Sequence, residues 1–187
     1  MLQELENAVS IMKKGGVILY PTDTVWGIGC DATNFTATDR IYKLKKRRES
    51  KSMIILVNDI NMLQEYVSDL PDIALDLINT FEKPTTIIYP HAKNIAKNLI
   101  GSDGSIAIRI VKNDFCNQLI HLLGKPIVST SANISGEQTP LSFNKISNEI
   151  TQSVDFIVSI NHDKINQFKP STILRLMENG EFKVIRQ

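Results

Sequence analysis

The chain has 187 residues, a length typical of a single domain with a sizeable core. Hydrophobic residues make up 42% and charged residues 22%, as in ordinary globular proteins. The net charge of +1 argues against a polycation that binds nucleic acid over its whole surface, so any basic site must be local.

The cysteines and the N-terminal residues indicate where the protein works. Cys30 and Cys116 lie far apart and have no metal-ligand spacing, which favours a reduced, cytoplasmic setting. The first residues include acids and no long apolar run, so no signal peptide is predicted. No segment approaches the roughly 20 apolar residues of a membrane helix, and we expect a soluble protein without membrane contact.

Hydrophobic spacing divides the chain into alternating helices and strands. It predicts helices at residues 2–14, 36–46, 60–67, 72–81 and 114–123. Apolar runs predict strands at residues 17–20, 53–57, 85–89, 105–111, 127–129 and 154–160. A hairpin is predicted for residues 171–177 and 182–185, around Asn179-Gly180. The alternation indicates one α/β domain over residues 1–187, and the hairpin argues against an all-parallel sheet.

The loop Pro21-Thr22-Asp23-Thr24 is the first of four candidate ligand-binding segments. It follows a short apolar strand, and ligands of α/β proteins usually bind beyond the carboxyl ends of strands. The loop offers two hydroxyls and a carboxylate, and Gly27 and Gly29 would let the backbone approach a ligand closely. The alternative is an ordinary polar turn.

The segment from Lys45 to Lys51 is the second candidate, because it has five cations in seven residues. Cations concentrated beside a sheet suit a polyphosphate, and arginine offers it bidentate hydrogen bonds. The alternative is a solvated helix end whose cations complement the helix dipole.

The segment Ser129–Gly136 is the third candidate. It places small polar side chains directly after a short apolar strand. Such a run can donate many hydrogen bonds to phosphate oxygens or a ribose, although a hydrophilic loop is the simpler interpretation.

Arg109 is the fourth candidate, because it is a lone arginine on an otherwise apolar strand, Ser105–Ile110. A buried guanidinium must find a partner or reach water. A bound carboxylate would satisfy it in a bidentate manner, and so would one of the chain's own carboxylates.

Several common signatures are absent. Neither G-x-x-x-x-G-K-[ST] nor G-x-G-x-x-G occurs, which excludes a P-loop and leaves no dinucleotide fingerprint. The three histidines are scattered without zinc-ligand spacing, so no protein-ligated metal is expected. Both cysteines are interpreted as core thiols. Trp26 could stack on a base or pack in the core.

Taken in order, these segments resemble the TsaC/YrdC family of threonylcarbamoyl-AMP synthases. The resemblance extends from Gly15-Gly16 to Arg186, and its motifs are GGVILYPTDTVWGIGCDA, YKLKKRRESKSMIILV, SIAIRI, KPIVSTSANISG and STIL. It implies a YrdC-like α/β domain with a twisted, mixed sheet flanked by helices and a positively charged concave face. It also implies ATP, L-threonine and bicarbonate as substrates, with Mg²⁺ accompanying the ATP.

The resemblance assigns roles to individual residues. The expected catalytic residues are Lys45 and Arg47 of the basic motif. The expected ATP-binding residues are Arg47, Lys51, Ser105, Ser131, Asn133, Thr139 and Arg186. The expected threonine-binding residues are Thr24, Arg109, Ser129 and Ser171, with Arg109 as the partner of the threonine carboxylate.

The chain departs from the family pattern at three positions. Trp26 stands where many relatives have tyrosine, and Arg48 stands where proline usually follows the motif arginine. Leu56 replaces a histidine that approaches threonine in some relatives. The additional C-terminal domain of longer relatives is missing, so the short bacterial form is expected.

The implied reaction joins a threonine carbamate to AMP and releases pyrophosphate. Such a step needs positioning and charge neutralisation more than proton transfer, in keeping with many hydroxyls and cations. The family implies that the product passes to a threonylcarbamoyl-transferase complex, which modifies adenosine beside the tRNA anticodon. Two alternatives stay open: a module that binds double-stranded RNA, and a paralogue that acts on another carbamoyl compound or nucleotide.

Overall fold

The computed structural model describes residues 1–48, 52–70, 73–74, 78, 80–159, 171–177 and 179–186. Its helices are α1 (Leu2–Lys13), α2 (Phe35–Leu44), α3 (Ile60–Tyr66), α5 (Asp114–Leu123) and α6 (Asn148–Thr151), with 3₁₀ turns η1 (Lys97–Leu99) and η2 (Phe143–Lys145). Its strands are β1 (Ile18–Tyr20), β2 (Gly27–Gly29), β3 (Ile54–Val57), β4 (Thr85–Tyr89), β5 (Ile106–Ile110), β6 (Ile127–Ser131), β7 (Phe156–Ile157), β8 (Thr172–Leu176) and β9 (Phe182–Arg186).

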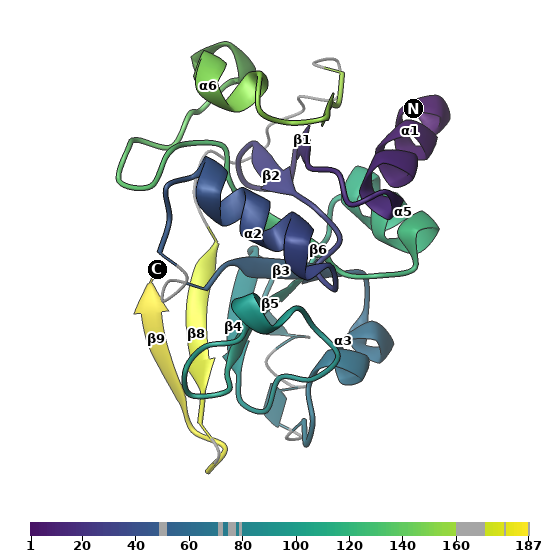
Figure 1. Ribbon diagram of the computed structural model, residues 1–187. Coiled ribbons are helices and arrows are strands. Elements are labelled where there is room, and N and C mark those ends of the chain that lie inside the picture. The colour runs from purple at the N-terminus through teal and green to yellow at the C-terminus, as the bar shows by residue number, and fades with distance from the viewer. Residues whose placement is uncertain are drawn as a thin grey trace.

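The strands form one mixed sheet in the order β7-β1-β2-β6-β3-β5-β4-β8-β9 (Figure 1). The pairs β1–β7, β3–β5 and β4–β8 are parallel. The neighbours β1–β2, β2–β6, β3–β6, β4–β5 and β8–β9 are antiparallel. The prediction of a mixed α/β sheet with a C-terminal hairpin is therefore confirmed.

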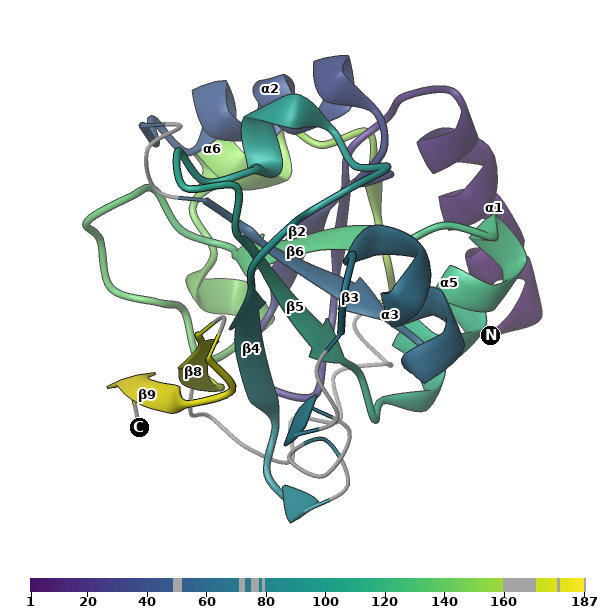
Figure 2. The same ribbon diagram turned by 90° about the horizontal axis from the view of Figure 1, so that it is seen from below.

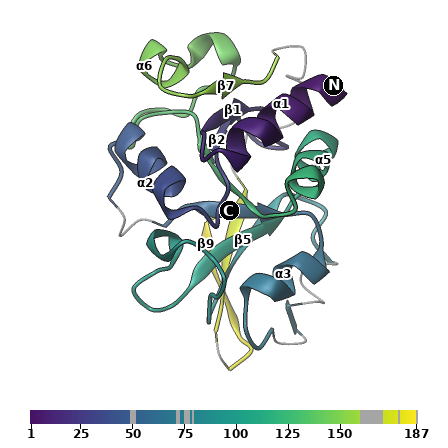
Figure 3. The same ribbon diagram turned by 45° about the vertical axis from the view of Figure 1, so that its right-hand side comes forward.

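Alternation along the strands separates two hydrophobic clusters, because successive side chains of a strand point to opposite faces. Ile55 and Val57 of β3 belong to the first cluster, which includes side chains of α2, α3 and η1. Leu56 belongs to the second cluster, which α1 and α5 build. Figure 2 shows the helices on both sides of the sheet, and Figure 3 shows α1 and α5 lying alongside each other.

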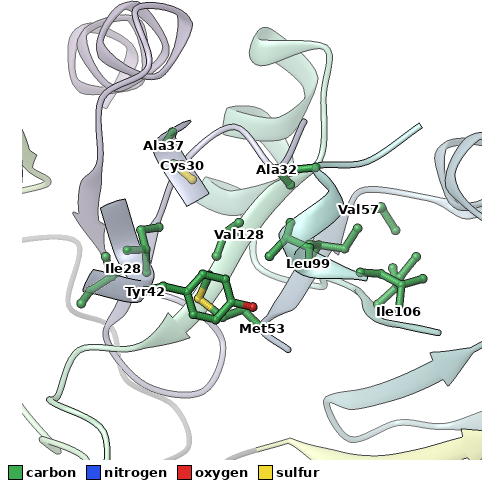
Figure 4. Packing of buried hydrophobic residues seen from close by; sticks show 14 of the residues in the cluster. Ile28, Cys30, Ala32, Ala37, Tyr42, Met53, Val57, Leu99, Ile106 and Val128 are labelled. Carbon is green, nitrogen blue, oxygen red and sulfur yellow. The ribbon is translucent and has the colours of Figure 1, made fainter. Parts of the chain in front are cut away.

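The first cluster is closely packed around small and large side chains. Figure 4 shows Ile28, Tyr42, Met53 and Leu99 within it, and all four are almost entirely buried. The Tyr42 hydroxyl donates to the Asn98 carbonyl at 3.0 Å, so the tyrosine is satisfied although it is buried. This cluster fixes α2 against the sheet, and the residues that follow α2 reach the candidate site.

Three strands differ from the sequence-based prediction. We predicted no strand at β2, whose Gly27-Ile28-Gly29 sequence has too few side chains to show a pattern. A Cβ on Gly29 would meet the Val128 carbonyl and lie 2.7 Å from Tyr20, so glycine allows the close packing. β6 continues to Ser131 because it pairs with β2, and β7 is shorter than predicted.

The helix predicted at residues 114–123 is confirmed as α5, whereas half of the helix predicted at 72–81 lies outside the described residues. Asn113 caps α5 by accepting from the Cys116 amide, and Gly124 ends it with φ 71°, a left-handed conformation that glycine adopts easily. Of the predicted helix at 72–81, residues 73–74, 78 and 80 are helical, Phe81 is not, and the other five lie outside the residues that the structure describes. None of the described helices is both long and apolar enough to span a membrane.

Candidate active site

A cavity of about 460 Å³ lies on the sheet face that also has α1 and α5. Its walls come from the loop at residues 22–27, residues 52–54, the loop at 101–105, and strands β5, β6, β8 and β9. Alternation explains its polar character. On β5, Ile106 and Ile108 enter the first core cluster, whereas Ala107 and Arg109 face the cavity.

The two threonines of the Pro21–Thr24 loop fix each other at the cavity wall. The Thr22 and Thr24 hydroxyl oxygens lie 3.0 Å apart, and the Thr24 amide donates to the Thr22 hydroxyl oxygen at 3.1 Å. The Thr22 hydroxyl also donates to the Val25 carbonyl at 2.8 Å. Both residues are buried, so the loop is a fixed part of the site rather than a solvated turn.

Arg109 forms an ion pair with Asp23, which belongs to the same loop. Arg109 Nη2 lies 2.9 Å from Asp23 Oδ1, within ion-pair distance although the two are not aligned as a hydrogen bond. The side chains are 4% and 13% exposed. Arg109 Nη1 donates to the Thr24 hydroxyl oxygen at 3.5 Å, while Arg109 Nε is buried without a hydrogen-bond partner. The chain's own carboxylate therefore balances the charge, yet a donor remains for a ligand.

The basic run divides into an inward and an outward part at the end of α2. Lys46 has φ 50°, and the Arg47 amide donates to the Tyr42 carbonyl at 2.9 Å, as in a left-handed helix terminus. Lys46 is exposed and forms a 2.8 Å ion pair with Glu149. Arg47 lines the cavity and donates to the Ser52 carbonyl at 2.9 Å. Burial lowers the pKa of the Arg47 guanidinium, which stays protonated at neutral pH.

Lys45 lies beneath the cavity wall instead of in it. Its side chain is buried, and its ammonium donates to the carbonyls of Ser131 and Asn133, the latter at 2.5 Å. The Lys45 carbonyl accepts from the Ser135 amide at 2.9 Å. Burial and then the nearby Arg47 charge lower the pKa of Lys45 to about 7. The lysine thus fastens the segment after β6 to the end of α2.

The end of β6 and the segment after it present hydroxyls to the cavity, whereas the Asn133 amide bonds to the backbone. Ser129, Ser131 and Thr139 line the cavity. Asn133 does not; its amide nitrogen donates to the carbonyls of Ile134 and Glu137 at 2.9 and 2.8 Å. These hydrogen bonds of Asn133 fix the loop at residues 133–137, and Thr139 follows this loop.

Ser171 is the contact point between β4 and the last strand. Its hydroxyl oxygen lies 2.8 Å from that of Thr86, and both side chains are buried. Its carbonyl accepts from Arg186 Nε at 3.2 Å and from Nη2 at 2.7 Å. Burial, followed by the charge of Arg109, lowers the pKa of Arg186. Ser171 and Arg186 thus line the cavity together.

The loop at residues 101–105 closes the outer side. The Asp103 carboxylate accepts from the Ser105 hydroxyl at 2.6 Å and from the Ser105 amide at 3.2 Å. It also forms a 2.7 Å ion pair with Arg175 of β8. Neither Asp103 nor Arg175 was singled out from the sequence, because each is an ordinary charged residue in its segment.

Comparisons with known proteins identify the family of the chain. The family model for Sua5, YciO and YrdC, described as "Telomere recombination", matches residues 10–187. The chain belongs to this family. It is 34% identical to a threonylcarbamoyl-AMP synthase from Pseudoalteromonas translucida, over 94% of this chain and 95% of that protein.

Two solved structures of the Sua5/YciO/YrdC family resemble this chain. The crystal structure of P. abyssi Sua5 complexed with L-threonine is 26% identical with a TM-score of 0.86, covering 93% of this chain and 51% of that one. The chain thus spans about half the length of that relative. E. coli YciO is 27% identical with a TM-score of 0.86, covering 100% of this chain and 90% of that one.

The cavity brings together most of the residues that the family resemblance predicted. Those that line it are Thr24, Arg47, Ser105, Arg109, Ser129, Ser131, Thr139, Ser171 and Arg186. Lys45 and Asn133 instead contact the backbone that supports its wall. Lys51 lies outside the described residues. Leu56 pairs with Arg109 in the sheet register but is buried against the second core cluster.

The balance of charge at the cavity favours an anionic ligand. Four guanidinium groups line it, those of Arg47, Arg109, Arg175 and Arg186, and among its described lining residues Asp103 is the one acid. No three described His, Cys, Asp or Glu side chains lie close enough together to bind a metal ion. Trp26 is fully buried and lies against Phe143, with ring centroids 5.1 Å apart, so it packs in the core.

Proposed function

We propose that this chain synthesises threonylcarbamoyl-AMP from L-threonine, bicarbonate and ATP. The threonine amine and bicarbonate form a carbamate with loss of water, or the amine adds to carbon dioxide with loss of a proton. One carbamate oxygen bonds to the α-phosphorus of ATP, the bond from that phosphorus to the bridging oxygen breaks, and pyrophosphate leaves. The reaction is a nucleotidyl transfer, and its product serves the threonylcarbamoyl modification of tRNA.

One observation supports this proposal above all others. A buried arginine with a free Nε donor, Arg109, lies in the same cavity as Arg47 and Arg186. The first suits the carboxylate of an amino acid, and the other two suit a polyphosphate. A cavity that offers both kinds of anion site fits a reaction between an amino acid and a nucleotide.

We assign to the lining residues the roles that the family resemblance implies. Thr24, Ser129 and Ser171 join Arg109 in binding threonine, because their hydroxyls can bind its polar groups. The ATP-binding residues are Arg47, Ser105, Ser131, Thr139 and Arg186, with Lys51 and Asn133 of the same motifs. Arg47 acts in catalysis by neutralising charge on the transferring phosphate.

Lys45 is assigned a supporting part in catalysis. Its ammonium binds the Ser131 and Asn133 carbonyls, which turns these oxygens away from a phosphate that they would repel. The neighbouring hydroxyl of Ser131 then faces the cavity. The lysine therefore acts through the wall that it fastens and does not touch the reacting atoms.

Magnesium enters this proposal together with ATP. Among the described lining residues the single carboxylate, Asp103, is engaged by Ser105 and Arg175, so the phosphates are the better oxygen ligands. Bound Mg²⁺ would neutralise phosphate charge, and the cavity arginines would orient the phosphates around it. We also propose a cytoplasmic location and delivery of the product to a threonylcarbamoyl-transferase complex.

Product analysis tests the proposal. Pyrophosphate and a threonylcarbamoyl adenylate should appear only when threonine, bicarbonate, ATP and magnesium are all present. Release of inorganic phosphate, or equal activity without threonine, would reject it.

The same assay separates the alternatives. A paralogue would form no product from threonine but would turn over another carbamoyl compound or nucleotide. An RNA-binding module would bind double-stranded RNA with a steep dependence on salt and no need for threonine. The convergence of four arginines on one cavity favours a small anion over an extended backbone.

A further inference from the structure

The cavity continues beyond the ion pair between Asp103 and Arg175. A second cavity of about 370 Å³ lies on the other side, towards the turn of the β8–β9 hairpin. The two cavities share Ile88, Asp103, Ser105 and Arg175 in their walls. The ion pair therefore lies between the two cavities and separates them.

This ion pair is exposed enough to be exchanged easily. The Arg175 and Asp103 side chains are 37% and 49% exposed. Exposed pairs contribute little to stability, because water and salt compete for both partners. A phosphate with two or more charges can therefore replace the carboxylate as the partner of Arg175 at small cost, with bidentate hydrogen bonds as the gain.

Asp103 is better fixed than Arg175, which decides which partner moves. Its carboxylate accepts both the hydroxyl and the amide of Ser105, two residues away in the same loop. Those two bonds persist when the arginine leaves. The Arg175 guanidinium, at the end of a flexible side chain, can then turn into either cavity.

We propose that Arg175 is a further phosphate-binding residue of the site, which exchanges Asp103 for the polyphosphate of the bound nucleotide. The inference rests on the proposed function, because it takes ATP as the ligand of the cavity. Asp103 acts as a placeholder that keeps the guanidinium beside the cavity when no nucleotide is bound. When the ion pair separates, the polyphosphate can also extend into the second cavity.

The exchange predicts opposite effects for the two partners. Arg175→Met should weaken the binding of ATP and of inorganic pyrophosphate by about tenfold, the loss of one charge-assisted contact. The affinities of Arg175→Lys should lie between those of the wild type and of Arg175→Met, because lysine keeps the charge and loses the bidentate geometry. Asp103→Asn should strengthen binding by roughly threefold, because the asparagine oxygen can still accept from Ser105 but no longer competes for Arg175.

A matched control comes from another ion pair of the same kind. Arg40 and Asp155 form a 2.5 Å ion pair whose side chains are 43% and 34% exposed, and neither lines the cavity. Arg40→Met should leave both affinities unchanged. Titration calorimetry without threonine, with and without magnesium, measures binding while no product forms.

Three outcomes would overturn the exchange. Equal weakening by Arg175→Met and Asp103→Asn would mean that the pair only supports the wall. If Arg175→Met binds ATP and pyrophosphate as the wild type does, Arg175 is not a phosphate-binding residue. Weakening by Asp103→Asn that occurs only with magnesium would make Asp103 a metal ligand. Each differs from failure of the proposed function, in which the wild type binds ATP but forms no adenylate from threonine.

Discussion

The candidate site has two arginine–aspartate pairs that differ in burial more than in the distance between their charges. Arg109 and Asp23 lie 2.9 Å apart and are 4% and 13% exposed, whereas Arg175 and Asp103 lie 2.7 Å apart and are 37% and 49% exposed. Breaking a buried pair leaves a charge that water cannot reach, while an exposed pair is readily replaced by water. Although the distances are similar, the Arg109 pair is therefore a fixed part of the cavity wall, whereas Arg175 can exchange its partner.

Removal of the buried carboxylate should have the largest effect. Asp23→Ala leaves Arg109 buried without its counter-charge, and we expect the free energy of unfolding to fall by about 3 kcal/mol. Denaturant unfolding of the variant and the wild type measures this difference. A loss as small as that of an exposed pair would show that the two pairs do not differ in the way burial suggests.

The next largest effect is expected on threonine binding. Arg109→Ala should raise the apparent threonine constant by about tenfold or more, because it removes a charge-assisted bond to the carboxylate worth about 1.5–3 kcal/mol. The ATP constant should rise less. Steady-state assays with each substrate varied in turn decide the assignment, and a rise confined to ATP would contradict it.

A double variant separates the loss of binding from a loss of folding. Asp23→Asn combined with Arg109→Gln removes both charges and leaves no buried ion unpaired. It should unfold less readily than Asp23→Ala yet keep the high threonine constant. Recovery of the normal threonine constant in the double variant would mean that the arginine matters only as the partner of Asp23.

Within the basic run, neighbouring cations should differ. Arg47→Ala should reduce turnover by about tenfold, equivalent to about 1.4 kcal/mol of barrier, because its guanidinium lines the cavity. Lys46→Ala is the matched control, since this lysine faces solvent beside Glu149. Rates and melting temperatures of both variants test this, and equal losses would indicate a diffuse basic surface instead.

The smallest effect is expected for the stability of the exposed pair. Asp103→Ala should lower the free energy of unfolding by at most about 1 kcal/mol at neutral pH. Hydrogen bonds from the Ser105 hydroxyl and then from Arg175 lower the pKa of Asp103. A lowered folded pKa contributes stability that is fully present above the unfolded value of about 3.9, so the difference from the wild type should shrink progressively below about pH 4 and disappear only as the pH falls through the lowered folded pKa. A difference that grows in acid would contradict this.

The sequence predicted elements where side chains repeat and failed where they do not. The apolar runs of β3, β4 and β5 and the helical spacing of α1 and α5 are all reproduced. Gly27-Ile28-Gly29 has only one side chain beyond hydrogen, so its pairing with β1 and β6 shows only in three dimensions. The polar residues Thr130 and Ser131 were expected in a loop, yet that pairing extends β6 to Ser131.

The site was predictable as a set of residues but not as a set of contacts. Motifs identified the residues that converge on the cavity, because they lie on short segments next to strands. A motif does not show that Asp23 is the partner of Arg109, since the two come together only through the fold. Equally, the motif singles out Lys45 and Arg47 but does not show that the Lys45 ammonium binds backbone carbonyls beneath the cavity wall; the turn at Lys46 and the fold decide that.

The sheet order has a consequence for how the protein folds. Strand β1 pairs with β7 and β4 with β8, so distant segments must meet before the sheet is complete. Such non-local pairing slows folding, and the cavity needs both Thr24 and Arg186 in place. A folding intermediate without the final hairpin therefore has no complete site, so bound ATP or threonine should slow unfolding without accelerating refolding.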